Sequence, residues 1–438
     1  MTVRAIYSLL LLFAMPIIVA RLVWRGFRQP AYLQHWSERF GIFSRARLKR
    51  AIWLHAVSVG EVRAASTLIK QLKMRYPDAP ILLTCMTPTG RATANELFAD
   101  SVTCVYLPYD FRVLQRRLIA RFDPQILLIM ETEIWPNLLA ACRNENLPVL
   151  LVNARLSEKS YCGYVRYALV QKLVNGALQS MRMVGAQSDA DAMRLTQLGA
   201  TQIEVTGNIK FDLIIDSAMV AKGQLWRSTL AKEKHVFLAA STRDGEEAML
   251  LDAFCRAFSA AEREKILFVI VPRHPQRFDA VDALIRAHHL TVTRRSTHET
   301  PDGACHVWLG DSMGEMAAYI AMCDIAFIGG SLLPLGGQNL IEACAQGKPV
   351  IMGPSNFNFS EAARLAIEAG AMRQVADADA LFATAKLLFK DVDARVKMGR
   401  AAETFAQTHA GATQKTMGLI APFIEPSIAP SIAPSTVE

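Results

Sequence analysis

Short apolar runs alternate with amphipathic stretches along most of this chain, and the pattern occurs twice. Apolar strands that alternate with helices form parallel sheets covered by helices on both faces. We therefore predict an α/β protein with two Rossmann-like parallel-sheet domains that face a cleft, and helices at 61–74 and 89–98 in the first domain. The runs expected as buried strands are 51–57, 80–86, 102–107, 125–131, 148–154 and 181–187, then 235–241, 266–272, 306–310, 324–330 and 348–354.

The length of 438 residues is too great for one core and fits two domains. The change from the first set of strands to the second lies near Thr206–Asp216. We predict an N-terminal anchor at 1–30, one domain at 31–212 and a second domain at 213–420. The Pro/Ser/Ala repeat at 421–438 predicts a disordered tail.

The segment Ala5–Ala20 contains no charged residue. Leu22–Trp24 can extend it to the length of a membrane-spanning helix if the arginine between them snorkels. The basic residues that follow favour a cytoplasmic location for the rest of the chain and disfavour export as a cleaved signal peptide. A buried core helix is a further alternative, but the segment has no polar face. The flanking arginines are Arg4, Arg21, Arg25 and Arg28.

Lys and Arg number 48 against 40 Asp and Glu, which gives a net charge of +8. This excess suits an anionic partner: nucleic acid, a phosphate-bearing lipid or a nucleotide-linked substrate. The 8 cysteines form no C-x-x-C motif and no Cys/His cluster, which argues against zinc and favours reduced cytosolic thiols. The two Asp-Ala-Asp segments follow no clear apolar strand, so we interpret them as helix starts and predict no metal site. A P-loop motif is absent.

In open parallel sheets, ligands bind beyond the carboxyl ends of the strands. Ser58 and Glu61 follow the first strand with the spacing of a capping box, and this structural role alone accounts for Glu61. In the functional interpretation, the helix dipole keeps the Glu61 carboxylate ionised as a general base. Gly60 would then permit a close approach of the backbone.

Glu131 and Glu133 follow another apolar strand, and alternation places them on the same side of an extended chain. Either one caps the next helix while the other is solvated, or one orients a reacting group. Lys210 lies at the predicted domain junction, where it is either solvated or paired with an anionic substrate.

In the second domain, Arg273 could bind a phosphate in a bidentate manner, and the neighbouring His274 is more simply a core or surface residue. Glu315 lies at a predicted helix start. Two glycine pairs precede Asn339 and Glu342, which have the spacing of a helix cap. Alternatively, the glycines let backbone N–H groups approach a phosphate, and the carboxylate of Glu342 binds ribose hydroxyls.

Ten segments, in this order, resemble the 3-deoxy-D-manno-octulosonic acid (Kdo) transferases. They are HAVSVGE, MTPTG, LPYD, METEIWPN, NARLS, TGNIKFD, VPRHPQRF, GDSMGEM, the loop GGSL…GGQN, and MGPSNFNF. The resemblance covers nearly the whole chain, including the N-terminal anchor.

The resemblance implies a GT-B glycosyltransferase on the cytoplasmic side of the inner membrane, with a single-pass or peripheral anchor. It implies inverting transfer of Kdo from CMP-Kdo to a phosphorylated lipid A precursor, without metal or other cofactor and without nucleic acid. Glu61 would be the proton acceptor, and Glu131 and Lys210 would stabilise the transition state. The implied CMP-binding residues are Pro272, Arg273, Met313, Gly314, Glu315, Asn339, Leu340, Ile341 and Glu342.

One position departs from the family, whose loop commonly has histidine where this chain has Gln338. A neutral amide donates hydrogen bonds but cannot become a cation, so the resemblance does not carry a role for a charged group over to Gln338. Two alternatives to the implied function are a GT-B transferase that uses a UDP-sugar and an exported, non-catalytic sugar-binding protein.

Overall fold

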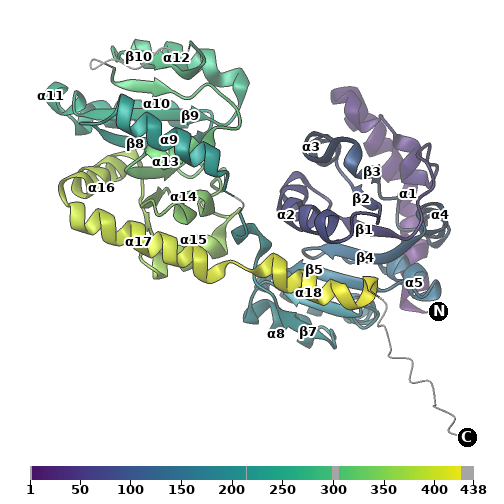
Figure 1. The fold of residues 1–438 in the computed structure, drawn as a ribbon. Helices are drawn as coiled ribbons and strands as arrows, with labels where there is room; N and C mark the ends of the chain where they lie inside the picture. The colour runs from purple at the N-terminus through teal and green to yellow at the C-terminus, as the bar shows by residue number, and fades with distance from the viewer. Residues whose placement is uncertain (1, 214, 298–304, 426–438) are drawn as a thin grey trace, which may run out of the picture. The chain divides into compact units, whose positions relative to one another are not determined.

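The computed structural model describes residues 2–213, 215–297 and 305–425. The chain forms two compact units (Figure 1). Unit 1 contains the residues up to Asp212 together with those from Ala410 onward, and unit 2 contains Leu213–His409. Each unit has its own seven-stranded parallel sheet, so the predicted α/β class with two Rossmann-like domains is confirmed.

The sheet of unit 1 has the strand order β3-β2-β1-β4-β5-β6-β7. The chain moves from β1 outward to β3 and then returns to the other side of β1 at β4. The carboxyl ends of β1 and β4 therefore flank the topological switch point, which is the usual ligand site of such sheets. The strands are β1 (Ala51–His55), β2 (Ile81–Cys85), β3 (Thr103–Tyr106), β4 (Pro124–Met130), β5 (Val149–Ala154), β6 (Met183–Ala186) and β7 (Ile203–Val205).

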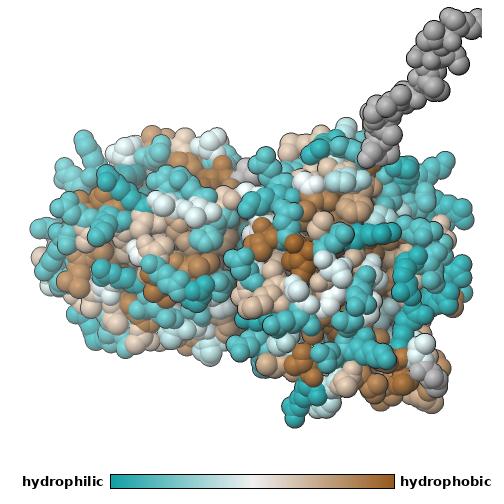
Figure 2. Space-filling model, turned by 90° about the horizontal axis from the view of Figure 1, so that it is seen from below, coloured by the Kyte–Doolittle hydropathy of each residue, from teal (hydrophilic) through white to brown (hydrophobic). Residues whose placement is uncertain are grey.

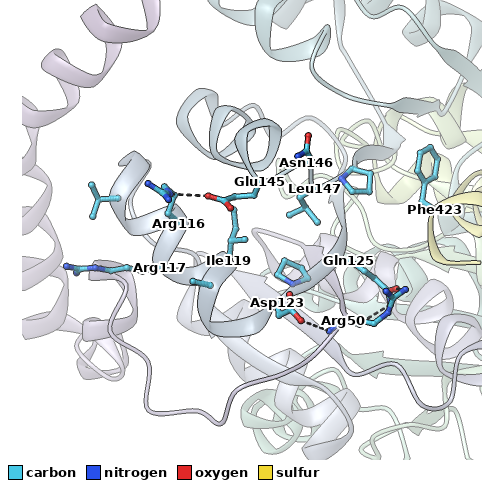
Figure 3. Close-up of a pocket in the computed structure, with 14 residues that line it drawn as sticks. Arg50, Arg116, Arg117, Ile119, Asp123, Gln125, Glu145, Asn146, Leu147 and Phe423 are labelled. Atoms are coloured by element: carbon cyan, nitrogen blue, oxygen red, sulfur yellow. Dashed lines mark hydrogen bonds and ion pairs between the residues drawn. The ribbon is translucent and has the colours of Figure 1, made fainter. Parts of the chain in front are cut away.

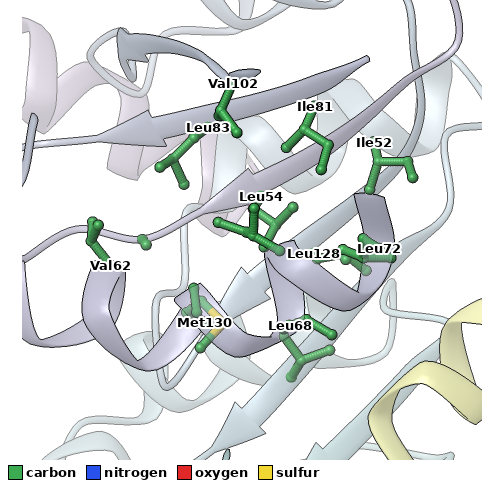
Figure 4. Close-up of a cluster of buried hydrophobic side chains, with 14 of the residues drawn as sticks. Ile52, Leu54, Val62, Leu68, Leu72, Ile81, Leu83, Val102, Leu128 and Met130 are labelled. Atoms are coloured by element: carbon green, nitrogen blue, oxygen red, sulfur yellow. The ribbon is translucent and has the colours of Figure 1, made fainter. Parts of the chain in front are cut away.

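Helix α2 (Val59–Arg75) packs on this sheet through an apolar stripe with helical spacing (Figure 4). Val62, Leu68 and Leu72 lie against Leu54 of β1 and Leu128 of β4 in one buried cluster. This packing fixes the first turn of α2 at the end of β1. The remaining helices of the unit's N-terminal segment, apart from α1, are α3 (Pro88–Phe98), α4 (Arg112–Phe122), α5 (Pro136–Asn144), α6 (Glu158–Val165), α7 (Ala168–Leu178) and α8 (Asp189–Gln197).

The sheet of unit 2 repeats this plan with the order β10-β11-β9-β8-β12-β13-β14, and its switch point lies at β8. The strands are β8 (His235–Thr242), β9 (Ile266–Pro272), β10 (Val292–Arg294), β11 (Val307–Leu309), β12 (Ile325–Ile328), β13 (Val350–Met352) and β14 (Met372–Gln374). The helices are α9 (Ser217–Leu230), α10 (Glu246–Ala257), α11 (Ala260–Arg263), α12 (Phe278–Ala287), α13 (Met316–Met322), α14 (Ile341–Ala345), α15 (Ser360–Glu368), α16 (Ala378–Lys390) and α17 (Val392–His409).

Helix α1 (Val3–Arg28) is long and apolar enough to cross a membrane, and several of its large apolar side chains, among them Leu10, Phe13 and Phe27, are exposed. The face of the molecule drawn in Figure 2 is otherwise mostly hydrophilic, with hydrophobic side chains in small groups. The N-terminal end of α1 is bonded to unit 1, because Tyr7 Oη donates to Asp110 Oδ2 at 3.1 Å. Near the other end, Leu22 is buried and Gly26 leaves room for Leu33, which belongs to the segment that directly follows α1.

The C-terminal domain boundary differs from the prediction. Residues 410–420 were expected in the second domain, but helix α18 (Ala412–Ile424) belongs to unit 1. Met417 and Ile420 of α18 complete the same buried cluster as α2. Residues 421–424 are therefore helical and not part of a disordered tail, while 426–438 lie outside the described residues.

Candidate active site

Glu61 lies in the first turn of α2, immediately beyond the carboxyl end of β1. Its Oε2 accepts the backbone N–H of Val57 at 2.7 Å, and its Oε1 accepts the hydroxyl of Ser58 at 2.9 Å. Ser58 Oγ in turn accepts the Glu61 N–H at 3.4 Å and caps the helix. Ser58 is therefore the predicted helix cap, but the capping box is incomplete because the Glu61 carboxylate accepts the Val57 N–H and not that of Ser58. These bonds hold the carboxylate in one orientation at the switch point.

Burial raises the pKa of Glu61, because the side chain is only 9% exposed. The hydrogen bonds from Val57 and Ser58 and the charge of Lys210 oppose this rise, whereas the charge of Glu131 adds to it. The net pKa is therefore raised, although the functional interpretation relies on the helix N-terminus to keep the carboxylate ionised. The higher pKa makes the carboxylate a stronger proton acceptor than a solvated glutamate.

Glu131 and Lys210 form an ion pair of 3.1 Å between Oε1 and Nζ. Glu131 follows β4 with a left-handed backbone (φ 55°), a conformation that non-glycine residues rarely adopt outside special sites. Lys210 lies in the short helix η4 (Ile209–Phe211), whose position is fixed by Asn153 at the end of β5. Asn153 Oδ1 accepts the Ile209 N–H at 3.0 Å, a positioning role that sequence reasoning missed.

The expectation that Glu131 or Glu133 caps the next helix is wrong. The carboxylate of Asp110 accepts the first N–H groups of α5, from Asn137 at 3.0 Å and Leu138 at 2.8 Å. The negative charges of Glu61 and Glu131 both raise the pKa of Glu133. Burial, followed by the charge of Glu61, raises the pKa of Glu133 to about 7.

These side chains form one cluster in unit 1. The sequence-predicted residues Glu61, Glu131 and Lys210 come from segments far apart in the chain, and the charges of Glu131 and Lys210 both act on Glu61. A proton acceptor with a raised pKa beside a cation can deprotonate a hydroxyl and stabilise negative charge.

A separate pocket of about 800 Å³ lies at the opposite end of the same sheet (Figure 3). Arg50 and Pro124 on its wall precede or begin strands of the sheet, and no predicted site residue lines it. Because ligands of parallel sheets bind at the carboxyl ends, this pocket is not the candidate active site.

The predicted CMP-binding residues all follow strands of unit 2 at their carboxyl ends. Pro272 is the last residue of β9, and the Arg273 N–H donates to Thr242 O at 2.9 Å. Met313, Gly314 and Glu315 follow β11, and Gly314 has the positive φ (82°) that favours glycine. Residues Asn339 to Glu342 follow β12.

Glu315 is held within unit 2 by basic side chains. It forms ion pairs with Lys222 and with Arg295, the latter at 3.1 Å, and it accepts a hydrogen bond from Ser312. Burial alone would raise the pKa of Glu315, but these partners outweigh it and the pKa is lowered. The carboxylate is therefore ionised and largely neutralised by its surroundings.

Asn339 lies just before Leu340, the N-cap residue of the short helix α14, and its Oδ1 accepts the N–H of Ile341, the first helical residue, at 3.0 Å. Its Nδ2 donates to Glu342 Oε1 at 3.1 Å, so the two side chains are linked. The predicted capping box is therefore wrong in its details, because Leu340 and not Asn339 is the N-cap residue and Glu342 bonds to the Asn339 side chain. Gln338 lies beside the first glycine pair, because its N–H donates to Gly329 O at 3.0 Å.

The glycine N–H groups were expected to approach a phosphate, but they are used within the protein. Those of Gly329 and Gly337 donate to Ala240 O and Gly330 O. Those of Gly330 and Gly336 donate to Glu246 Oε2 at 2.6 Å and to Ser355 Oγ at 2.9 Å. The glycines thus allow a tightly folded loop, since a Cβ on Gly329 would lie 2.6 Å from Ser241 O.

Glu246 is the residue that sequence reasoning missed in unit 2. It is fully buried at the start of α10, and its carboxylate accepts four backbone N–H groups. The Arg243 N–H donates to it from the β8–α10 turn, and three consecutive N–H groups donate from the β12 loop. The acidic side chain at a helix N-terminus was visible in the sequence. However, three of its four partners, Gly330, Ser331 and Leu332, lie more than 80 residues away in the chain.

Within the described ranges, no group of three or more His, Cys, Asp or Glu side chains is placed to hold a metal ion. The positive charge of Lys210 acts on the Glu61 carboxylate.

The fold places the chain in the GT-B class of two-domain α/β proteins. A glycosyltransferase from Rickettsia africae superimposes with a TM-score of 0.55 over 88% of this chain and 100% of that chain, at 15% identity. The UDP-GlcNAc 2-epimerase from Neisseria meningitidis superimposes with a TM-score of 0.56 over 84% of this chain and 99% of that chain, at 14% identity.

The chain belongs to the 3-deoxy-D-manno-octulosonic acid transferase family, and it is an enzyme that transfers Kdo. Residues 34–213 match the family described as 3-Deoxy-D-manno-octulosonic-acid transferase (kdotransferase). The transferase of Bordetella pertussis is 42% identical over 88% of this chain and 90% of that protein. The transferase of Haemophilus influenzae is 35% identical over 96% of this chain and 99% of that protein. Because the chain is an enzyme of this family, the alternative of a non-catalytic sugar-binding protein is wrong.

Proposed function

We propose that the enzyme transfers Kdo from CMP-Kdo to a sugar hydroxyl of a phosphorylated lipid A precursor (lipid IVA), with inversion at the anomeric carbon. The acceptor oxygen forms a bond to the anomeric carbon and gives its proton to Glu61. The bond between that carbon and the phosphate oxygen breaks, and CMP leaves with the electron pair. The balance of atoms and charge needs no further reactant.

The proposal rests on the burial, the fixed orientation and the raised pKa of the Glu61 carboxylate. The carboxylate is buried, oriented by Val57 and Ser58, and has a raised pKa at the switch point of the unit 1 sheet. A general base of this kind accepts a proton from a hydroxyl more readily than a solvated carboxylate does. Direct attack by an acceptor activated in this way, on the face opposite the leaving group, produces inversion.

Lys210 and Glu131 have a supporting role in the proposed reaction. The Lys210 ammonium stabilises negative charge that develops as CMP separates, and Glu131 holds Lys210 in place through their 3.1 Å ion pair. Because side chains supply this stabilisation, we propose that transfer requires no metal ion.

For the donor, we propose that unit 2 binds CMP-Kdo at the carboxyl ends of β9, β11 and β12. Proteins of this fold bind nucleotides at this edge of the sheet. The proposed contacts are Pro272, Arg273, Met313, Gly314, Glu315, Asn339, Leu340, Ile341 and Glu342.

We propose that α1 holds the enzyme on the cytoplasmic face of the inner membrane as a peripheral anchor. The N-terminal end of α1 is bonded to unit 1, since Tyr7 donates to Asp110. A helix held against a folded unit near one end need not cross the bilayer. It can lie along the surface, with Leu10, Phe13 and Ile17 in the lipid, where the acceptor resides.

Mass analysis tests the proposal directly. The full-length enzyme in detergent, incubated with CMP-Kdo and lipid IVA, should increase the mass of the lipid by one or more Kdo residues and release CMP. An unchanged lipid mass with an active relative as positive control would contradict the proposed donor and acceptor. Release of CMP without lipid modification would contradict the acceptor alone.

A further inference from the structure

Arg243 occupies a defined place in the unit 2 loops that none of the predicted site residues covers. It directly follows β8, and its N–H donates to Glu246 Oε2 at 2.9 Å. The same oxygen accepts the Gly330 N–H at 2.6 Å. The Arg243 side chain begins against this glycine, because a Cβ on Gly330 would lie 3.4 Å from Arg243 Cγ. The β8 and β12 loops thus fix the base of the Arg243 side chain together.

The acidic residues next to Arg243 in the sequence are all committed to other partners. Asp244 pairs with Arg277, and Glu247 accepts hydrogen bonds from Arg277 at 3.0 Å and from Thr242 at 2.9 Å. The carboxylate of Glu246 accepts hydrogen bonds from four backbone N–H groups. Across the described parts of the chain, the half-buried Arg243 guanidinium enters no ion pair. A half-buried cation without a carboxylate is ready for an anion from outside the protein.

A second arginine, Arg273, directly follows the neighbouring strand β9, just as Arg243 follows β8. The Arg273 N–H donates to Thr242 O at 2.9 Å, which places the backbones of Arg243 and Arg273 side by side at the ends of β8 and β9. The charges of both reach His274, whose pKa is lowered first by burial and then by Arg243 and Arg273. Positive charge is therefore concentrated at this sheet edge.

We infer that Arg243 binds the carboxylate of the donor sugar and thereby selects an acidic sugar over a neutral one. The inference rests on the proposed function, in which the donor carries two anionic groups, a phosphodiester and the sugar carboxylate. Arg273, a predicted CMP contact, meets the phosphodiester, and the planar guanidinium of Arg243 meets the carboxylate in a bidentate manner. A neutral sugar would leave Arg243 half-buried without an anion, which disfavours its binding.

The test separates the sugar from the nucleotide, because CMP lacks the sugar carboxylate. Arg243→Ala should raise the KM for CMP-Kdo by ~10-fold or more and change the Kd of CMP, measured by calorimetry, by less than ~2-fold. Arg243→Lys, which keeps the charge but loses the bidentate geometry, should give an intermediate KM. The matched control is Arg364→Ala, an exposed arginine paired with Glu361 and Glu368, which should change neither constant.

Two results would overturn the inference. An unchanged KM for CMP-Kdo in Arg243→Ala shows that the carboxylate has another partner. An equal loss of affinity for CMP and CMP-Kdo shows that Arg243 acts on the nucleotide or on the fold, and a lowered melting temperature identifies the latter. Failure of the wild-type enzyme to use CMP-Kdo at all contradicts the proposed function instead, so the two failures are distinguishable.

Discussion

Lys210 Nζ lies 3.1 Å from Glu131 Oε1, although the two residues are 79 positions apart in the chain. Their segments meet because β4 and β5 are neighbours in the sheet and Asn153 at the end of β5 holds η4 in place. About a quarter of each side chain is exposed. Such a partly solvated pair contributes little to folding, on the order of 1 kcal/mol or less. Its position beside Glu61 indicates that its main effect is on the reaction.

We therefore expect Lys210→Ala to lower kcat by ~100-fold while the melting temperature changes little. Glu131→Gln should lower kcat less, because Lys210 keeps its charge but loses its fixed position. In the double variant the two losses should not add, since both changes disturb one interaction. Steady-state kinetics and thermal melting of all four proteins test this. A large drop in melting temperature for Lys210→Ala with normal kcat would assign the pair a purely structural role.

Glu61→Gln should abolish transfer, with kcat at least ~100-fold lower, because the amide cannot accept the proton of the attacking hydroxyl. The amide keeps an oxygen for one hydrogen bond, so the fold and the Kd for CMP should be retained. Ser58→Ala is the matched control: it removes the hydroxyl donor to Glu61 and the helix cap but keeps the carboxylate. It should cost about 1 kcal/mol of stability and retain most of the activity. Wild-type turnover in Glu61→Gln would place the base elsewhere.

EDTA treatment followed by desalting should leave the transfer rate unchanged, because in the proposed reaction Lys210 supplies the positive charge that a metal ion would otherwise provide. The rate is measured before and after treatment, with and without added Mg²⁺. A rate that falls on chelation and returns with Mg²⁺ would contradict metal-independent transfer.

The sequence predicted the buried strands well and the edge strands poorly. Every predicted apolar run contains a strand, because central parallel strands are buried on both faces and must be apolar throughout. The three strands it missed, β7, β10 and β14, lie at sheet edges and are three residues long, and all their side chains except Met372 are exposed or partly exposed. Helix α18 was assigned to the wrong unit for a different reason. Its partners, such as Leu54 and Leu128, are hundreds of residues away, and local periodicity does not identify them.

For the candidate site, the sequence predicted the residues but not the hydrogen bonds that position them. Strand ends and family motifs identified Glu61, Glu131 and Lys210, because chemistry at a parallel sheet concentrates at these ends. The spacing of Glu61 could not separate a cap from a base, and the structure shows that the cap orients the same carboxylate. The bonds of Asp110 and Glu246 join segments far apart in the chain, so spacing alone did not reveal them.

The elevated pKa of Glu133 predicts a pH-dependent stability. Its folded-state pKa of about 7 exceeds the usual 4.5, so between these values the folded protein binds more protons than the unfolded chain. The free energy of unfolding therefore declines as pH rises through this window. Glu133→Gln should stabilise the protein by about 1–2 kcal/mol at pH 8, after allowance for solvent screening, and by almost nothing at pH 4.5.

The same substitution bears on catalysis. With a pKa of about 7, Glu133 is mostly protonated and neutral on the acid limb of the kcat/KM profile, so its removal should leave that limb nearly unchanged. Chemical denaturation at several pH values and a pH–rate profile measure the two effects. A stability difference that does not vary with pH would show that Glu133 titrates normally.

Substitution of Glu246 should cause the largest loss of stability in unit 2. One carboxylate there accepts hydrogen bonds from four buried or partly buried N–H groups of two loops. Glu246→Gln replaces one acceptor oxygen by an NH₂ group that faces N–H donors. Hydrogen bonds to a buried charge are strong, so the free energy of unfolding should decline by at least about 2 kcal/mol. The β8 and β12 loops should separate, and the affinity for CMP-Kdo should therefore decrease.

Glu262→Gln is the control, since Glu262 also accepts N–H and hydroxyl donors at a helix start but is exposed to solvent. It should lower the denaturation midpoint far less and leave the KM unchanged. Equal midpoints for the two variants would contradict the role assigned to the buried carboxylate.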